Sequence, residues 1–185
     1  MRWFWVDRII AFESGRRVVA IKNVSLAEEI LDEHIDGFPF LPQSFVIEGL
    51  AAAGGLLLAE WTQFRENVVL AKITKARLYD VARPGDTLTY TITLEDLKPE
   101  GGVATGTSHI GERLQADVEL CFAYLDKSIF NGRIISAEGY AKIVRSIRLY
   151  EVGCDQAGQR LQFPFELLQA EAGPLRHPDP SGTPA

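Results

Sequence analysis

Cysteine is scarce in this sequence, and the shortage excludes whole classes of site. Cys121 and Cys154 are the two cysteines among 185 residues, and they lie far apart. Two distant cysteines provide neither a disulfide framework nor the closely spaced ligands of a zinc site. We therefore expect no metal centre, and a reducing, cytoplasmic location is the simplest interpretation.

Positive charge is also in short supply. The chain has 19 Lys and Arg against 25 Asp and Glu, a net charge of −6. Proteins that bind nucleic acid neutralise phosphates with clustered basic side chains, so we expect no nucleic-acid partner. The length and a hydrophobic content of 46% are those of a globular chain with a substantial core.

Long hydrophobic runs are limited to one segment, "SFVIEGLAAAGGLLLAEW" at 44–61. Its length approaches the roughly 20 residues needed to cross a bilayer, but Glu48 lies within it, where a carboxylate is costly. We therefore predict a buried helix at about 44–64 and no membrane span. Asp7 and Arg8 interrupt the apolar N-terminus, which we interpret as the start of the fold rather than a signal peptide.

The segments around this helix have the composition of β-strands. They are rich in β-branched and aromatic residues, and turn residues such as Gly15 and "RPGD" separate them. The predicted strands are 3–12, 16–24, 67–79, 86–98, 102–110 and 114–126. One long helix among antiparallel strands predicts an α+β fold in which the sheet curls round the helix. A helix that is apolar on every face also predicts cover by a second subunit.

The C-terminal third has weaker patterns. Residues 136–152 are compatible with a helix that places Ile143, Ile147 and Tyr150 on one face. Residues 173–185 contain four prolines and two glycines, a composition typical of a disordered tail. We divide the chain into a domain at 1–126, a partly helical extension at 127–172 and a disordered tail at 173–185.

Glu48 is the first candidate for chemistry. It lies about one turn into the predicted helix, with Ala52 and Gly55 at i+4 and i+7. A carboxyl group desolvated by such a stripe favours its neutral form, which a general acid near neutral pH requires. Alternatively, Glu48 satisfies backbone donors near the positive end of the helix. The residue types alone do not decide between these interpretations.

His34 is the second candidate. It follows "SLAEEILDE", a short helical turn with a capping pattern, and precedes the irregular loop "DGFPFLPQ". His109 lies in a predicted strand and His177 in the tail, so His34 is the one histidine in a loop beside a candidate acid. A neutral imidazole that accepts a proton while Glu48 donates one suits elimination of water from a β-hydroxy carbonyl compound. A backbone N–H would stabilise the oxyanion.

At this point the sequence resembles a known family. "HIDGFPFLPQSFVIEGLAA" is similar to the motif H-F-P-G-x-P-x-M-P-G-V-x-x-x-E-A-x-A-Q of the β-hydroxyacyl-acyl-carrier-protein dehydratases of fatty-acid biosynthesis, the FabZ/FabA type. It keeps five motif residues, with Glu48 fourteen positions after His34. The resemblance covers about residues 3–126 and includes the flanking segments "KARL" and "RPGDTL". The residues kept are His34, Gly37, Pro39, Pro42 and Glu48.

The resemblance implies a hot-dog fold, with His34 as the base and Glu48 as the acid. The backbone N–H of Gln43 would polarise the thioester carbonyl. The substrate would be carried on the phosphopantetheine of acyl carrier protein, with no other cofactor. In the family each site combines two subunits of a dimer, and dimers commonly form hexamers, so we expect a homodimer, with a trimer of dimers as the larger assembly.

The resemblance also implies an apolar substrate tunnel beside the central helix, to which we assign Phe45 and Ala52. A basic rim would receive the acidic carrier protein. Exposed cations near strand ends are usually only solvated, so the rim rests on the resemblance alone. Its residues would be Lys72, Lys75, Arg77 and Arg83.

Three departures from the family pattern leave alternatives open. Gln43 replaces a glycine, Asp36 replaces a proline near the base, and Ala52 replaces a glutamine that can hydrogen-bond the acid. Dehydration of β-hydroxyacyl thioesters, or the reverse hydration, is the leading hypothesis. A non-catalytic subunit that binds acyl chains or supports a hetero-oligomer is the second, and an acyl thioesterase is the third.

Overall fold

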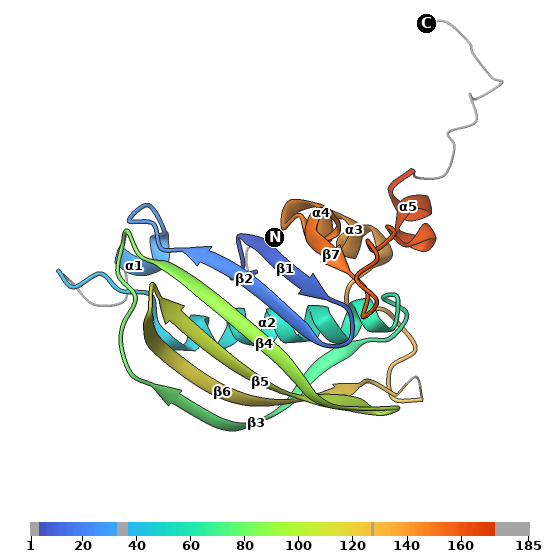
Figure 1. Ribbon diagram of the computed structural model, residues 1–185, viewed down its shortest axis with the longest axis horizontal. Helices are drawn as coiled ribbons and strands as arrows, with labels where there is room; N and C mark the ends of the chain where they lie inside the picture. Colours follow the sequence, from blue (N-terminus) through green and yellow to red (C-terminus); the bar gives the residue numbers. More distant parts are fainter. Residues whose placement is uncertain (1–3, 33–36, 127, 173–185) are drawn as a thin grey trace, which may run out of the picture.

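The computed structural model describes residues 4–32, 37–126 and 128–172 of the chain. Seven strands and five helices make up this part (Figure 1). In chain order they are β1 (Arg8–Glu13), β2 (Arg17–Asn23), α1 (Glu29–Asp32), α2 (Gln43–Trp61), β3 (Val68–Leu78), β4 (Thr87–Lys98), β5 (Gly101–Ile110), β6 (Arg113–Tyr124), α3 (Ala137–Ser146), α4 (Leu149–Val152), β7 (Gly153–Cys154) and α5 (Phe165–Ala172).

One sheet contains all seven strands, in the order β3-β6-β5-β4-β2-β1-β7. The first six pair antiparallel, as the turn-separated strand pattern predicts. The seventh strand, β7, was not predicted from the sequence, and it pairs with β1 in parallel. A parallel neighbour requires a long return of the chain, and here residues beyond 126 supply it.

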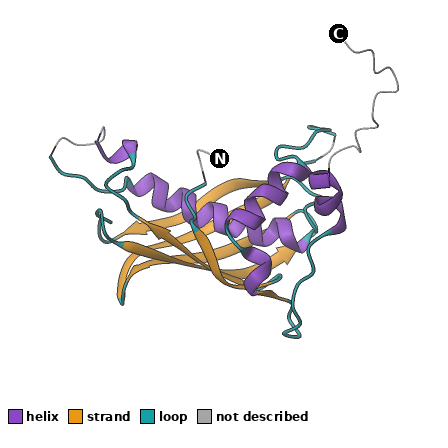
Figure 2. Ribbon diagram, turned by 90° about the horizontal axis from the view of Figure 1, so that it is seen from above, coloured by secondary structure: helices purple, strands orange, loops and turns teal. Residues whose placement is uncertain are grey.

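The long apolar helix α2 lies across one face of the curved sheet, with α3 on the same face (Figure 2). Alternate residues of the strands point towards α2, and in β4 these are Leu88, Tyr90 and Ile92, all fully buried. The helix also comes close to the sheet, since a Cβ on Gly54 would lie 2.8 Å from the ring of Phe122. This is the α+β hot-dog arrangement that the sequence predicts.

The length and composition of α2 would be enough to cross a membrane, but most of the helix is buried within the chain's own core. Its burial is therefore that of the core helix of a folded domain. One stripe is not covered by the sheet: Glu48 is exposed, and Ala52 and Gly55 are half-buried. This uncovered stripe positions the candidate site.

Residues 128–172 add α3, α4, β7 and α5 to the domain, near one end of α2 (Figure 1). The predicted helix at 136–152 is two helices, α3 and α4, separated at Arg148, whose φ of +62° is incompatible with a continuous helix. Ser136 begins α3 by accepting a hydrogen bond from the Gly139 N–H at 3.0 Å. The predicted tail at 173–185 lies outside the described residues.

Candidate active site

Glu48 lies in the second turn of α2, on the stripe that faces away from the sheet. The prediction that its neighbours desolvate the carboxylate is wrong for the single chain, because the side chain is exposed. The small residues at i+4 and i+7 do not cover it, since the sheet packs against other faces of the helix. In the described part of the chain no group hydrogen-bonds Glu48, which agrees with the replacement of the family's glutamine by Ala52.

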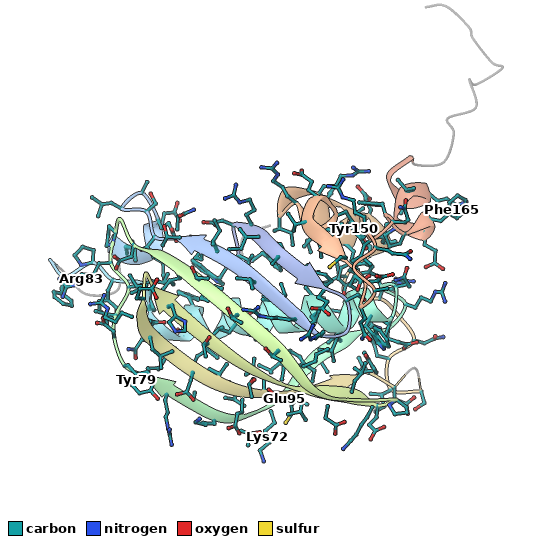
Figure 3. All side chains as sticks on the ribbon, viewed as in Figure 1. Lys72, Tyr79, Arg83, Glu95, Tyr150 and Phe165 are labelled. Atoms are coloured by element: carbon teal, nitrogen blue, oxygen red, sulfur yellow. The ribbon has the colours of Figure 1, made fainter. Side chains whose placement is uncertain are left out.

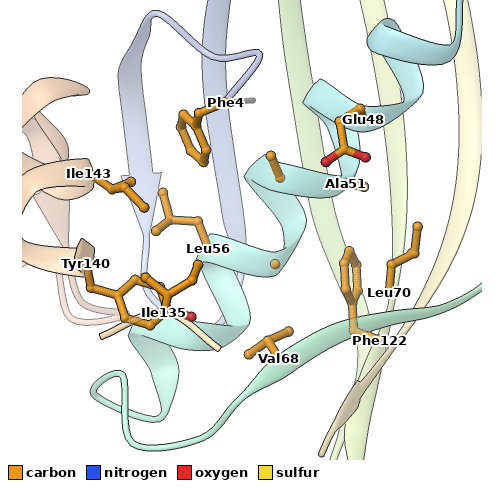
Figure 4. A pocket seen from close by; sticks show the side chains of 12 residues that line it. Phe4, Glu48, Ala51, Leu56, Val68, Leu70, Phe122, Ile135, Tyr140 and Ile143 are labelled. Carbon is orange, nitrogen blue, oxygen red and sulfur yellow. The ribbon is translucent and has the colours of Figure 1, made fainter. Parts of the chain in front are cut away.

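Glu48 borders an apolar pocket with a volume of about 290 Å³. This is at the lower end of the range of about 300–1,000 Å³ found for small-molecule sites. Figure 4 shows Glu48 at one end, Phe122 and Leu70 along one side, and Tyr140 at the other end. The lining residues are Phe4, Glu48, Ala51, Ala52, Gly55, Leu56, Val68, Leu70, Phe122, Ile135, Tyr140 and Ile143. A carboxylic acid at the mouth of such a pocket can protonate a group on an apolar ligand.

His34 and Asp36 lie outside the described residues, so the pairing of His34 with Glu48 stays a prediction. The loop after them is described. Gly37 has a φ of +71°, a conformation that glycine adopts without strain. The Leu41 N–H donates to the Ala82 carbonyl at 2.8 Å, and buried Pro42 directly precedes α2. This part of the loop is thus held against both the helix and the segment before β4.

A buried lysine, which the sequence interpretation missed, anchors the chain before His34. The side chain of Lys22 is 8% exposed, and its Nζ lies 2.8 Å from the Glu28 carboxylate and 3.7 Å from that of Asp7. Glu28 also accepts the Ser25 N–H at 3.1 Å, as the predicted capping pattern requires. Strand alternation would have revealed Lys22, because it shares the inward face of β2 with Val18.

Gln43 is the first residue of α2, where backbone N–H groups have no acceptor within the helix. Its side chain lies near the Asp80 carbonyl, with 3.5 Å between Nε2 and the oxygen. Phe45 stacks on Trp5 with ring centroids 4.2 Å apart and does not line the pocket, whereas Ala52 does. The oxyanion role of Gln43 and the tunnel roles of Phe45 and Ala52 stay predictions.

The four predicted rim cations lie in different places. Lys72, Lys75 and Arg77 belong to the edge strand β3, and the Lys75 Nζ lies 2.6 Å from the Asp117 carboxylate. The hydrogen bond from Lys75, followed by that from Tyr79, holds the pKa of Asp117 below its usual range.

Arg83 stacks on Phe38 at 4.4 Å, beside the motif loop. Figure 3 shows Arg83 at one end of the sheet and Lys72 on the middle of β3. Arg83 is thus the member of the predicted rim that contacts the motif loop.

A second carboxylate of α2, Glu60, is buried although the sequence interpretation did not single it out. Its residue is 1% exposed, and Ser14 Oγ donates to it at 2.5 Å. Burial raises the pKa of the Glu60 carboxyl, while hydrogen bonds from Ser14 and Gln63 act in the opposite direction. Burial is the larger cause of a raised pKa at Tyr150, and the nearby negative charge of Glu60 is the smaller one. Glu60 does not line the Glu48 pocket, and its buried hydrogen bond from Ser14 indicates a structural role.

Comparison with known proteins identifies the domain. Residues 3–118 match the FabA-like domain. The chain is 35% identical over 122 residues to the 3-hydroxyacyl-(acyl-carrier-protein) dehydratase FabZ of Symbiobacterium thermophilum, a match that covers 65% of this chain and 86% of that protein. The FabZ of Desulforamulus reducens is 37% identical over 119 residues, which cover 64% and 84%.

Solved structures share the architecture at lower identity. The dehydratase heterocomplex ApeI:P of Xenorhabdus doucetiae aligns with a TM-score of 0.58 at 18% identity, covering 69% of this chain and 86% of that chain. The uncharacterized protein PH1136 of Pyrococcus horikoshii gives a TM-score of 0.54 at 16% identity, with 67% and 86% covered. These neighbours support the hot-dog fold. Because the FabA-like match spans residues 3–118 and the two FabZ relatives are matched over 86% and 84% of their lengths, the chain belongs to the FabA-like dehydratase family.

Proposed function

We infer that this protein is a dehydratase that removes water from β-hydroxyacyl thioesters on acyl carrier protein, in the synthesis of fatty acids or related lipids. The observation that carries this conclusion is the position of Glu48 at the mouth of an apolar pocket on the central helix of a FabA-like domain. The FabZ relatives, which act on 3-hydroxyacyl groups carried by acyl carrier protein, support the same substrate class.

The proposed reaction uses two proton transfers. The neutral imidazole of His34 removes the α-proton, and the electron pair forms the α,β double bond as the bond to the β-oxygen breaks. Glu48 gives its proton to the departing hydroxyl, which leaves as water, and the product is a trans-2-enoyl thioester. The Gln43 N–H, at the start of α2, stabilises the negative charge that develops on the thioester oxygen. This route needs no cofactor beyond the carrier's phosphopantetheine.

A homodimer would complete the site. In the described part of the chain, β3 pairs with β6 on one side and has no partner strand on the other. Leu70 and Ile73 on β3 are 39% and 43% exposed. Pairing of β3 with its copy would bury these side chains and place a second subunit beside the uncovered stripe of α2. The desolvation of Glu48 that a single chain does not provide would then come from the dimer. A trimer of dimers is the proposed larger assembly.

The carrier protein is the proposed partner, and a cytoplasmic location is proposed with it. Arg83 is the rim residue best placed for this contact, because it lies beside the motif loop. Lys72 and Arg77 would extend a positive surface along β3, and Lys75 is partly neutralised by Asp117. Such a surface favours association with an acidic partner.

A non-catalytic subunit is the second candidate, and the environment of Glu48 favours it. The carboxylate has no hydrogen-bond partner in the described part of the chain, so nothing there fixes its orientation. A chain of this kind would bind acyl groups or support an active partner.

A dehydration assay with a β-hydroxyacyl carrier-protein substrate separates the two candidates. The dehydratase is expected to form the enoyl thioester, and His34→Ala is expected to lose this activity. Wild-type protein that retains an acyl ligand in mass spectrometry but forms no product would favour the second candidate. Activity of His34→Ala equal to that of wild type would overturn the proposed mechanism.

A further inference from the structure

The far end of the Glu48 pocket is formed by residues outside the FabA-like match. The match ends at residue 118, whereas Ile135, Tyr140 and Ile143 belong to the segment that begins α3 and to α3 itself. In Figure 4 these three side chains lie at the end of the pocket away from Glu48. The extension therefore supplies a wall that the matched domain alone does not have.

Hydrogen bonds hold the beginning of this wall on the loop between α2 and β3. Asn67 donates to the Gly132 carbonyl at 2.7 Å and accepts the Ile134 N–H at 2.9 Å. The guanidinium of Arg133 donates to the Phe64 carbonyl at 2.5 Å. Residues 132–134, directly before Ile135, are thus fixed to the core domain.

The end of the wall is held on the sheet. The Ile9 N–H in β1 donates to the Ile147 carbonyl at 2.8 Å, and β7 pairs with β1. Between these anchors α3 buries Tyr140, Ile143 and Val144, and the Tyr140 ring lies 4.9 Å from that of Phe64. Because both ends are attached and the inner face is buried, α3 is a fixed part of the pocket.

The wall is apolar apart from one hydroxyl group. Burial raises the pKa of Tyr140, so its hydroxyl stays neutral at physiological pH. The pocket follows α2 from Glu48 to Leu56, a span of roughly 12 Å at the rise of an α-helix. An acyl chain that enters beside Glu48 therefore meets α3 after a limited depth.

We propose that α3 closes the acyl pocket and that Ile135, Tyr140 and Ile143 limit the length of the acyl chain that the enzyme accepts. This inference rests on the proposed function, because the acyl thioester of that reaction is the ligand that fills the pocket. The wild type prefers short β-hydroxyacyl groups, and loss of bulk at the wall admits longer ones.

The test compares substrates of different length in two matched variants. The double variant Ile135→Ala/Ile143→Ala removes bulk that faces the pocket, whereas Val144→Ala removes buried bulk from α3 without altering the lining. The readout is the ratio of kcat/KM for β-hydroxypalmitoyl to that for β-hydroxybutyryl carrier protein. This ratio is expected to rise at least about tenfold in the double variant, since each methylene group moved into an apolar pocket contributes about fourfold. It is expected to stay at the wild-type value in Val144→Ala.

Two results would overturn the inference: an unchanged ratio in a folded double variant, or an equal rise in Val144→Ala. The proposed function is judged separately, by whether the wild type dehydrates any substrate of the series. If it dehydrates none, binding of the corresponding acyl-pantetheine thioesters, measured by calorimetry, decides the inference alone. Tighter binding of long chains by the double variant than by wild type supports the wall, and equal binding contradicts it.

Discussion

The two carboxylates of α2 occupy opposite environments on the same helix. Glu48 is exposed at the mouth of the pocket, whereas Glu60, three turns later, is buried and accepts a hydrogen bond from Ser14. A raised pKa is a common marker of a catalytic acid, yet within this chain burial raises the pKa of the residue outside the pocket. The comparison shows that access to a ligand, rather than burial alone, distinguishes a candidate acid from a structural one.

The largest expected effect separates the two residues by activity. Glu48→Gln removes the proposed proton donor and is expected to lower kcat about 10²–10⁴-fold with little change in Tm. Glu60→Gln keeps the shape of a side chain outside the pocket and is expected to retain wild-type turnover. Enoyl-thioester formation and thermal unfolding of both variants check this. Equal activity losses in the two variants would contradict the distinction.

Two adjacent glycines extend the comparison to the two faces of the helix. A Cβ on Gly54 would lie 2.8 Å from the ring of Phe122, whereas a Cβ on Gly55 would meet the same ring at 3.8 Å, an ordinary contact. Gly54→Ala is therefore expected to destabilise the protein by about 1–2 kcal/mol through overpacking. Gly55→Ala is expected to stabilise it by about 0.5–1 kcal/mol, since alanine is the better helix former. Urea denaturation measures the free energy of unfolding of both variants. A Gly54→Ala variant as stable as wild type would contradict the close packing.

The smallest expected effect is the pH dependence that Glu60 contributes to stability. Well below pH ~4.3 the carboxyl group is protonated in the folded and the unfolded state, and it adds no pH dependence. As the pH rises above this value the unfolded state loses its proton first, because burial raises the folded-state pKa. The free energy of unfolding then falls, by at most about 1.4 kcal/mol per pH unit, until the folded state also ionises.

Glu60→Gln removes this contribution, and wild type measured at the same pH values is the control. The difference in unfolding free energy between the variant and wild type, measured by urea denaturation, is expected to shift in favour of the variant from acid to neutral pH. Other carboxylates cancel in this difference because both proteins contain them. A difference that is independent of pH would show that Glu60 has the same pKa in the folded and unfolded states.

Much of the fold can be predicted from the sequence because the sheet has one buried face. Alternation along β4 marks Leu88, Tyr90 and Ile92 as core residues, and the apolar run at 44–61 marks the central helix. The parallel strand β7 could not be predicted in this way, because two residues carry no periodicity and its pairing depends on how the extension returns to β1.

The candidate site is predictable in its residue types and less so in its environment. The spacing of His34 and Glu48 comes from the motif, but the small residues after Glu48 do not reveal whether anything covers the carboxylate. The burial of Lys22 and Glu60 was not predicted, because charged residues are usually assigned to the surface. Glu60 is buried against Ser14, which is distant in sequence, and Lys22 against Glu28, which lies in the loop after its strand.

The short strand β7 has a consequence for the size of any assembly. It lies along β1 at Phe12 and Glu13, and the Ile147 carbonyl accepts the nearby Ile9 N–H, so the extension shields this border of the sheet. A sheet with two open borders can add copies without limit and grow into a fibre. Because β7 covers β1 at Phe12 and Glu13, the proposed pairing through β3 would join two copies and leave these positions closed to a further strand. In the proposed dimer the extension would thus limit the growth of the sheet and favour a closed particle over a polymer.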